Sequence, residues 1–393
     1  MFKKFFFSAL LLITSNGLFA QQTPIPNSAS NNAVIIPSPP QLASSAYVLM
    51  DADTGHIVVE HNADQKLPPA SLTKMMSSYI VSEEISAGRV KETDMVNISV
   101  NAWKMGGSKM FVREGNTVSV HDLLLGVIVQ SGNDASVALA EHVAGGEGAF
   151  ADVMNQTAVL LGMNHTHYVN ATGWPAEGHL TTARDLAVLA RAVINDHPEY
   201  YELYAEKYFS YNGINQPNRN RLLFRDESVD GLKTGHTEAA GYCLVASAKR
   251  DQMRLISVVM GTVSEDARAA ETQKLLAYGF RYFENQVIYR PADTIESRKV
   301  WYGTTDTVNL VVAEDLNLTL PRGSRGRLDA SLQLDDTLKA PIAQGQALGK
   351  LKVSLDGEVL AEVPVVARDA VEEAGFFTRL VDAIKLFVSG LFE

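Results

Sequence analysis

Three short motifs place nucleophilic and basic side chains in one order along the chain. They are Ser71-Leu72-Thr73-Lys74, Ser131-Gly132-Asn133 and Lys233-Thr234-Gly235. Each motif alone is short enough to occur by chance in a surface loop or at a helix start, so only their joint occurrence carries weight. Together they supply a hydroxyl nucleophile, a base and a strand edge on which a substrate can lie, which are the parts needed for acyl transfer.

Ser71 and Lys74 have the spacing of a nucleophile and its base. Ser71 follows Pro68-Pro69 and opens a helix predicted over about 71–85, so the two side chains share one helix face. A serine hydroxyl is a poor nucleophile until a base takes its proton. Lysine can be that base when burial and a nearby positive charge, here Lys233, lower its pKa. Helix N-terminal amides near Ser71 could stabilise an oxyanion.

The other two motifs can handle a peptide substrate. Ser131 can relay a proton to a leaving amine, and Asn133 offers an amide donor and an acceptor. Lys233, Thr234 and Gly235 are predicted on an edge strand. An extended substrate can pair with such a strand, and glycine permits close approach.

Composition excludes several other classes of protein. The 393 residues, 46% hydrophobic and 20% charged, indicate two or three folded domains rather than a disordered chain or a polytopic membrane protein. A net charge of −11 without a basic stripe argues against nucleic acid as a partner. One cysteine, Cys243, excludes an intramolecular disulfide framework. His165 and His167 lack an HExxH pattern and a third ligand, so we expect no metal and no cofactor.

The N-terminus has the pattern of a secretory signal. Residues 1–20 combine Lys3 and Lys4, a short apolar run and a small residue, Ala20, at a plausible cleavage site. The alternative is a membrane anchor, but the run is much shorter than the ~20 apolar residues that span a bilayer. Residues 21–41, rich in proline and polar residues, are predicted to be a flexible lead.

The remaining chain predicts a mixed α/β (α+β) architecture. Residues 42–284 combine a hairpin near 46–60, a mostly helical stretch over 90–200, three strands between 229 and 261 and a helix over 266–284. This pattern predicts an antiparallel sheet flanked by helices. Residues 285–370 alternate as strands, with Asp356-Gly357 as a hairpin turn, and predict a separate β domain.

Residues 371–393 predict an amphipathic helix. From Phe376 onward nine apolar residues fall on one face and the charged residues on the other. Such a helix can lie in a membrane surface. The alternative is that it packs on the protein's own core.

Three longer strings around the motifs resemble one enzyme family. They read PPASLTKMMSSYIV, LLLGVIVQSGNDASVALAEHVAG and VDGLKTGHTEAAGY. They are similar to the penicillin-recognising serine enzymes. Over residues 40–393 the chain most resembles low-molecular-mass penicillin-binding proteins that act as D-alanyl-D-alanine carboxypeptidases. The resemblance implies a catalytic domain of the β-lactamase/transpeptidase type.

The resemblance also implies roles in acylation. Ser71 would be the acylated nucleophile and Lys74 its base. Ser131 and Asn133 would assist, and Lys233 would set the electrostatics of the site.

Further roles implied by the resemblance concern substrate binding. The backbone amides of Ser71 and His236 would form the oxyanion hole. Thr234, with Arg219 and Arg268, would hold the terminal carboxylate of the substrate.

The implied activity is removal of the terminal D-alanine from peptidoglycan pentapeptides, with β-lactams acylating the same serine. The enzyme would be periplasmic, attached to the inner membrane by residues 371–393, and its oligomeric state stays open. A β-lactamase is one alternative, but Thr181 stands where the asparagine partner of a deacylating Glu177 would be required. A D,D-endopeptidase and a non-catalytic wall-binding scaffold are the other two.

Overall fold

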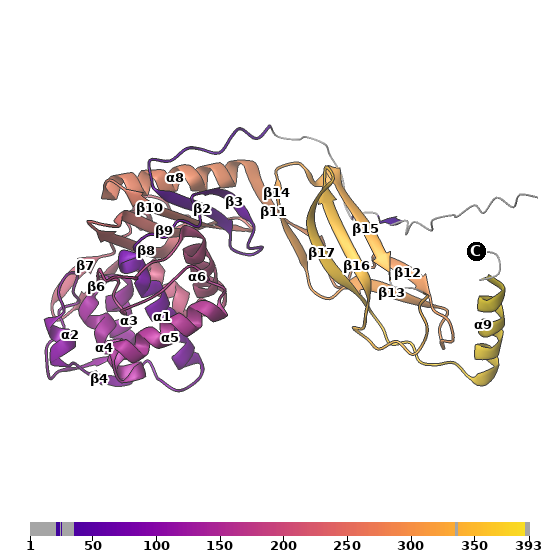
Figure 1. Ribbon diagram of the computed structural model, residues 1–393, viewed down its shortest axis with the longest axis horizontal. Coiled ribbons are helices and arrows are strands. Elements are labelled where there is room, and N and C mark those ends of the chain that lie inside the picture. Colours follow the sequence, from indigo (N-terminus) through magenta and orange to yellow (C-terminus); the bar gives the residue numbers. More distant parts are fainter. Residues whose placement is uncertain (1–20, 24, 26–34, 335–336, 390–393) are drawn as a thin grey trace, which may run out of the picture. The chain divides into compact units, whose positions relative to one another are not determined.

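The computed structural model describes residues 21–23, 25, 35–334 and 337–389, so the predicted signal peptide lies outside the described residues. Two compact units are present (Figure 1). The first unit, which carries the three sequence motifs, comprises Ala33–Gln286 with Thr319–Arg322. The β unit comprises Val287–Leu318, the chain from Gly323 onward and the described residues before Ala33.

A five-stranded antiparallel sheet forms the centre of the first unit. Its order is β3-β2-β10-β9-β8. The strands are β2 (Ala46–Asp51), β3 (Ile57–His61), β8 (Val229–Thr237), β9 (Gly241–Arg250) and β10 (Met253–Thr262). The Lys-Thr-Gly motif lies on β8, which is an edge strand as predicted. The mixed architecture with an antiparallel sheet is therefore confirmed.

The sheet separates two hydrophobic cores, because successive side chains of a strand point to opposite faces. Val48 and Val245 belong to the larger core, which faces the helices of the middle of the chain. Leu49 and Leu244, their neighbours, belong to the core beneath α8 (Glu265–Tyr282). Figure 1 shows α8 on one side of the sheet and the other helices on the opposite side.

Helix α1 (Thr73–Ser86) is the centre of the helical layer, and its residues from Thr73 to Ser82 are buried. A short 3₁₀ turn, η1 (Ala70–Leu72), precedes it and carries Ser71. The other helices are α2 (Val100–Lys104), α3 (Val120–Ile128), α4 (Asn133–Ala144), α5 (Glu147–Leu160), α6 (Ala183–Asn195), α7 (Pro198–Tyr201), η2 (Glu202–Ala205) and η3 (Arg221–Phe224). Two small ladders join β4 (Met95–Asn97) to β5 (Thr117–Ser119) and β6 (Tyr208–Tyr211) to β7 (Ile214–Pro217).

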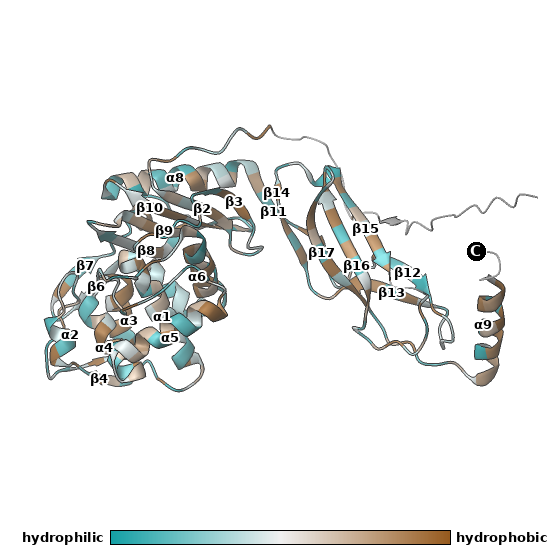
Figure 2. Ribbon diagram, viewed as in Figure 1, coloured by the Kyte–Doolittle hydropathy of each residue, from teal (hydrophilic) through white to brown (hydrophobic). Residues whose placement is uncertain are grey.

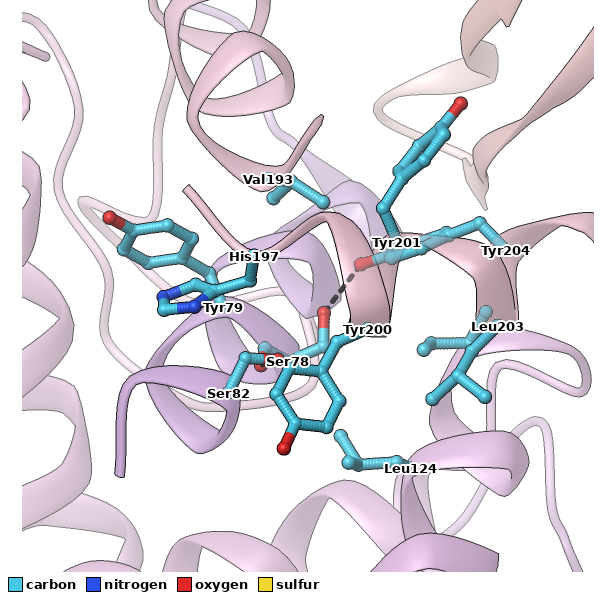
Figure 3. Close-up of a pocket in the computed structure, with 11 residues that line it drawn as sticks. Ser78, Tyr79, Ser82, Leu124, Val193, His197, Tyr200, Tyr201, Leu203 and Tyr204 are labelled. Atoms are coloured by element: carbon cyan, nitrogen blue, oxygen red, sulfur yellow. Dashed lines mark hydrogen bonds between the residues drawn. The ribbon is translucent and has the colours of Figure 1, made fainter. Parts of the chain in front are cut away.

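Polar contacts fix the later turns of α1. The hydroxyls of Ser78 and Tyr204 lie 2.5 Å apart, and the Tyr79 hydroxyl donates to Asp196 at 2.9 Å. Ser78, Tyr79 and Tyr204 line a cavity of about 10 Å³ (Figure 3). A cavity of this size holds about one water molecule. The hydrogen bonds therefore fix α1 firmly, and with it the position of Lys74 in its first turn.

The β unit contains a six-stranded antiparallel sheet of order β1-β15-β16-β17-β13-β12. Its strands are β1 (Gln21–Thr23), β12 (Glu296–Lys299), β13 (Thr307–Val312), β15 (Leu328–Leu334), β16 (Ala347–Leu355) and β17 (Glu358–Ala367). Strand β11 (Phe283–Tyr289) pairs with β14 (Leu316–Pro321), and η4 (Arg325–Arg327) precedes β15. Asp356 and Gly357, with φ of 51° and 89°, form the predicted turn between β16 and β17.

Helix α9 (Phe376–Ser389) is the last element of the described chain. It confirms the helix that the periodicity of the sequence predicts. Its apolar side chains are strongly exposed, with Phe377 at 81% and Phe387 at 70%. Figure 2 colours most of α9 brown. Asp382, on the polar face, accepts a hydrogen bond from the Tyr302 amide at 2.9 Å. Among the described residues, no helix combines the length and hydrophobicity needed to cross a membrane.

Candidate active site

Ser71 and Lys74 contact each other at the start of α1. The Lys74 Nζ lies 3.0 Å from the Ser71 Oγ. It also donates to the Asn133 Oδ1 at 2.7 Å and to the Thr172 carbonyl oxygen at 2.6 Å. Lys74 is fully buried. The predicted nucleophile and base are therefore in direct hydrogen-bond contact, and a third motif residue, Asn133, joins them.

The surroundings of Lys74 favour a neutral amine. Burial, followed by the positive charge of Arg219, lowers the pKa of Lys74 to about 7, against the opposing influence of Asp134. A neutral amine has two N–H donors and one lone pair. The donors match the acceptors on Asn133 and Thr172, so the lone pair can receive the Ser71 hydroxyl proton.

The second motif lies where α4 begins. Ser131 has a left-handed φ of 60°, which a non-glycine residue adopts only at a cost in free energy. Its Oγ is buried and has no hydrogen-bond partner within the described part of the chain. The Asn133 side-chain nitrogen donates to the Gly106 carbonyl at 2.7 Å and keeps a second hydrogen. Both side chains thus retain hydrogen-bonding capacity beside Lys74.

Strand β8 approaches Ser71 from the sheet. A Cβ atom at Gly235 would lie 3.1 Å from the Pro69 carbonyl oxygen and 3.2 Å from the Leu72 Cγ. Glycine therefore allows this strand to run close beside η1. Lys233 is buried on the same strand, and its Nζ makes one hydrogen bond of 3.3 Å, to the Thr234 carbonyl.

Positive charge accumulates around Lys233. Burial lowers the pKa of Lys233 well below its usual value, and the charges of Lys74, Arg219 and Arg268 lower it further. Arg268, buried on α8, donates to the Gly235 carbonyl at 3.3 Å. The exposed Arg219 donates to the Gln130 carbonyl at 3.2 Å. These positively charged groups therefore favour the binding of an anion at this site.

Eight of the ten predicted site residues lie on or next to η1, α1, α4 and β8, and the two arginines reach these elements through the Gln130 and Gly235 carbonyls. Thr234 is buried next to Lys233, and His236 follows Gly235 at the surface. The rings of His236 and Tyr242 lie 4.0 Å apart between their centres. The His236 amide directly follows Gly235, the residue through which β8 lies against the η1 turn that carries Ser71.

A loop over 170–174 completes the site, and the sequence motifs do not include it. Gly173 has φ of +82°, and a Cβ atom there would lie only 1.8 Å from the Ala70 carbonyl oxygen. The Asn170 Oδ1 accepts hydrogen bonds from the amides of Thr172, Gly173 and Trp174. The only sequence signal was the Asn-Ala-Thr-Gly turn composition.

The sequence analysis also missed His179, because it considered His165 and His167 as the candidate metal ligands. The Val169 amide donates to the His179 Nδ1 at 3.1 Å, so Nε2 carries the proton and donates to the Thr73 Oγ1 at 2.9 Å. Burial lowers the pKa of His179 to about 4. A neutral histidine thus ties the loop to the first turn of α1.

Two family models match the chain. Residues 33–264 match the family of D-alanyl-D-alanine carboxypeptidases of peptidase S11, and residues 283–373 match the C-terminal domain of penicillin-binding protein 5. The chain is 44% identical to the D-alanyl-D-alanine carboxypeptidase DacC of Escherichia coli, covering 88% of this chain and 89% of that protein. For DacA of the same organism the identity is 43%, with 91% and 90% covered.

A solved structure extends the similarity to the whole fold. Penicillin-binding protein 5 from Haemophilus influenzae superimposes with a TM-score of 0.82 at 42% identity, covering 86% of this chain and 100% of that one. A D-alanyl-D-alanine endopeptidase of E. coli is more distant, at 30% identity over 65% of this chain. The chain therefore belongs to the D-alanyl-D-alanine carboxypeptidases of the peptidase S11 family, which are serine hydrolases.

Proposed function

We propose that Ser71 forms an acyl-enzyme with the penultimate D-alanine of peptidoglycan pentapeptide stems and releases the terminal D-alanine. The observation that carries this proposal is the 3.0 Å contact between the Ser71 Oγ and a fully buried Lys74 whose pKa is lowered to about 7. A lysine tuned in this way can act as a general base near neutral pH.

The acylation step follows from these contacts. Neutral Lys74 takes the hydroxyl proton while the Ser71 Oγ attacks the terminal peptide carbonyl. The amides of Ser71 and His236 stabilise the oxyanion. The C–N bond then breaks, the D-alanine nitrogen receives a proton through Ser131, and water later hydrolyses the ester.

Carboxylate recognition distinguishes a carboxypeptidase from an enzyme that cuts inside a chain. The terminal carboxylate would meet Lys233, Thr234 and the two arginines, Arg219 and Arg268. These cations have no acidic partner except Glu265, which lies 4.0 Å from Arg268 in the described structure. An anion bound here would therefore satisfy an otherwise uncompensated positive field.

β-Lactams should react with the same serine. Penicillin-binding protein D2 of Listeria monocytogenes, 30% identical to this chain, has been solved in an ampicillin-bound form. The β-lactam carbonyl would take the place of the scissile carbonyl, and its carboxylate that of the terminal D-alanine.

Intact mass spectrometry after brief exposure to benzylpenicillin tests the nucleophile. We expect the wild type to gain one whole penicillin on the peptide that contains Ser71, and Ser71→Ala to gain none. D-Alanine release from a pentapeptide should follow the same pattern. A folded wild type without either reaction would refute the proposal, and rapid penicillin hydrolysis would favour a β-lactamase.

We also propose that the enzyme is exported and held at the inner membrane surface by α9. The exposed apolar face of α9 supports this, since burial in lipid would remove that face from water. Deleting residues 371–393 should release the protein from membrane vesicles and leave benzylpenicillin acylation unchanged. Retention of the truncated protein on vesicles would contradict the anchor.

A further inference from the structure

A second hollow lies directly beside the nucleophile. Its volume is about 340 Å³, within the range of pockets that hold small ligands. The lining residues on which the argument depends are Pro69, Ala70, Trp174, Glu177, Thr237 and Ala239. Ala70 immediately precedes Ser71 in η1. None of these side chains has a part in the acylation step described above.

The direction of β8 decides which part of a substrate reaches this cavity. Along β8, Lys233 and Thr234 come before Gly235, whereas Thr237 comes after it. A substrate whose carboxylate binds at the lysine end and whose reactive carbonyl lies opposite Gly235 must run toward Thr237 with its acyl portion. One residue of extended chain covers about 3.3 Å. The residue before the D-Ala-D-Ala dipeptide therefore arrives at the mouth of the cavity.

The walls of the cavity are apolar and fixed in place. The Trp174 ring packs against the loop that contains Gly106 and Gly107. A Cβ atom at Gly106 would lie 3.4 Å from the ring, and one at Gly107 only 3.1 Å. Pro69 and Ala70 form the side next to the nucleophile. Such walls suit the methylene groups of a long aliphatic side chain.

One charged group lies at the rim. Glu177 is exposed and has no ion-pair partner among the residues that the structure describes. The other titratable lining residue, His179, is neutral because burial lowers its pKa to about 4. The cavity therefore has apolar walls and a single negative charge, which together fit an alkyl chain that ends in an ammonium group.

We propose that this cavity binds the side chain of the stem residue that precedes the terminal D-Ala-D-Ala, and that Glu177 pairs with an ammonium group at the end of that side chain. The proposal rests on the function proposed above. It makes the enzyme selective for stems that carry a free side-chain amine at this position.

Two tripeptides that differ in one acetyl group test the selectivity. Nα-acetyl-L-lysyl-D-alanyl-D-alanine keeps the side-chain amine, and the Nα,Nε-diacetyl form has none. We expect wild-type kcat/KM for D-alanine release to be about fivefold higher for the free amine, as for a partly exposed ion pair. Glu177→Gln should remove this preference, and 0.5 M salt should weaken it in the wild type.

Glu238→Gln is the matched control. Glu238 has the same charge in the turn after β8 but does not line the cavity, so this variant should keep the preference. Equal rates of the wild type with both peptides, or an equal loss of preference in the two variants, would overturn the proposal. Benzylpenicillin acylation separates the two levels: a wild type that is acylated but shows no preference refutes only the cavity's role, whereas one that is not acylated and releases no D-alanine refutes both proposals.

Discussion

The two walls of the active site hold their buried lysines in different ways. The helical wall, formed by η1, the first turn of α1, the start of α4 and the loop over 170–174, gives Lys74 three contacts between 2.6 and 3.0 Å. The strand wall, β8, gives Lys233 one contact of 3.3 Å, to the carbonyl of its own neighbour. Both lysines are buried, so burial alone does not determine how they differ.

The difference indicates two separate tasks. Every hydrogen-bonding position of a neutral Lys74 is matched by a protein group, which fixes the lone pair in the direction of Ser71. Among the described residues the Lys233 Nζ makes one hydrogen bond and keeps unused donors, and the charges of Arg219 and Arg268 add to its positive surroundings, an arrangement that is unfavourable until an anion binds. The hydrogen bonds of Lys74 in the helical wall are therefore all formed without substrate, whereas Lys233 in the strand wall gains its partner when the substrate binds.

Replacing Lys74 should have the largest effect. Lys74→Ala removes the base and should reduce the rate of acylation by benzylpenicillin about 10³-fold, as expected for loss of general base catalysis. Stopped-flow or quenched mass spectrometry would measure this rate. Circular dichroism would establish that the variant is folded. A folded variant that retains more than a tenth of the rate would show that another group takes the Ser71 proton.

Replacing Lys233 should lower activity and raise stability together. Lys233→Met removes a group that stabilises the bound anion, so acylation should slow about 10²-fold. Because the lysine is buried without an acidic partner, the free energy of unfolding at pH 7 should increase. Urea denaturation would measure it, with Lys249→Met, an exposed lysine on β9, as the control. A large loss of stability in Lys233→Met would mean that this lysine supports the fold.

Two glycines that lie against η1, Gly173 within the helical wall and Gly235 on the strand wall, provide a third test. At Gly173 a Cβ atom would lie 1.8 Å from a backbone oxygen at φ +82°, whereas at Gly235 the nearest atom would be 3.1 Å away. We expect Gly173→Ala to lower the free energy of unfolding by about 2–3 kcal/mol, and Gly235→Ala by about 1 kcal/mol. Thermal unfolding of both variants would decide. The reverse order would mean that the loop over 170–174 relaxes more easily than the strand.

The sequence could predict the residues of both walls but only part of their arrangement. The strand wall follows from a Lys-Thr-Gly run that lies in a β-type segment, and the predicted edge position is confirmed. The contact of Lys74 with the Thr172 carbonyl could not be predicted, since every residue has a carbonyl and its position depends on the folded loop. The Ser131 hydroxyl, which has no hydrogen-bond partner among the described residues, and its left-handed φ likewise have no signal in residue type.

The position of the loop over 170–174 could not be predicted from the sequence for the same reason. Asn170 and Gly173 have the composition of an ordinary turn, and nothing in the sequence shows that this turn touches η1. His179 was missed because a neutral structural histidine cannot be told from a surface one by its neighbours in sequence. Close contacts between segments about 100 residues apart depend on tertiary packing, which periodicity does not report.

The pH dependence of acylation provides the finest test of the comparison. Because the pKa of Lys74 is lowered to about 7, the neutral, reactive amine predominates above pH 7 and declines below it. The second-order rate constant with benzylpenicillin should therefore be nearly constant above pH 8 and fall about tenfold per pH unit below pH 6.5. His236→Gln removes the neighbouring titratable side chain on β8, and we expect it to keep the same midpoint. A wild-type profile that stays level through pH 7, or a midpoint that moves in His236→Gln, would mean that Lys74 is not the proton acceptor, and the assignment of separate tasks to the two lysines would fail.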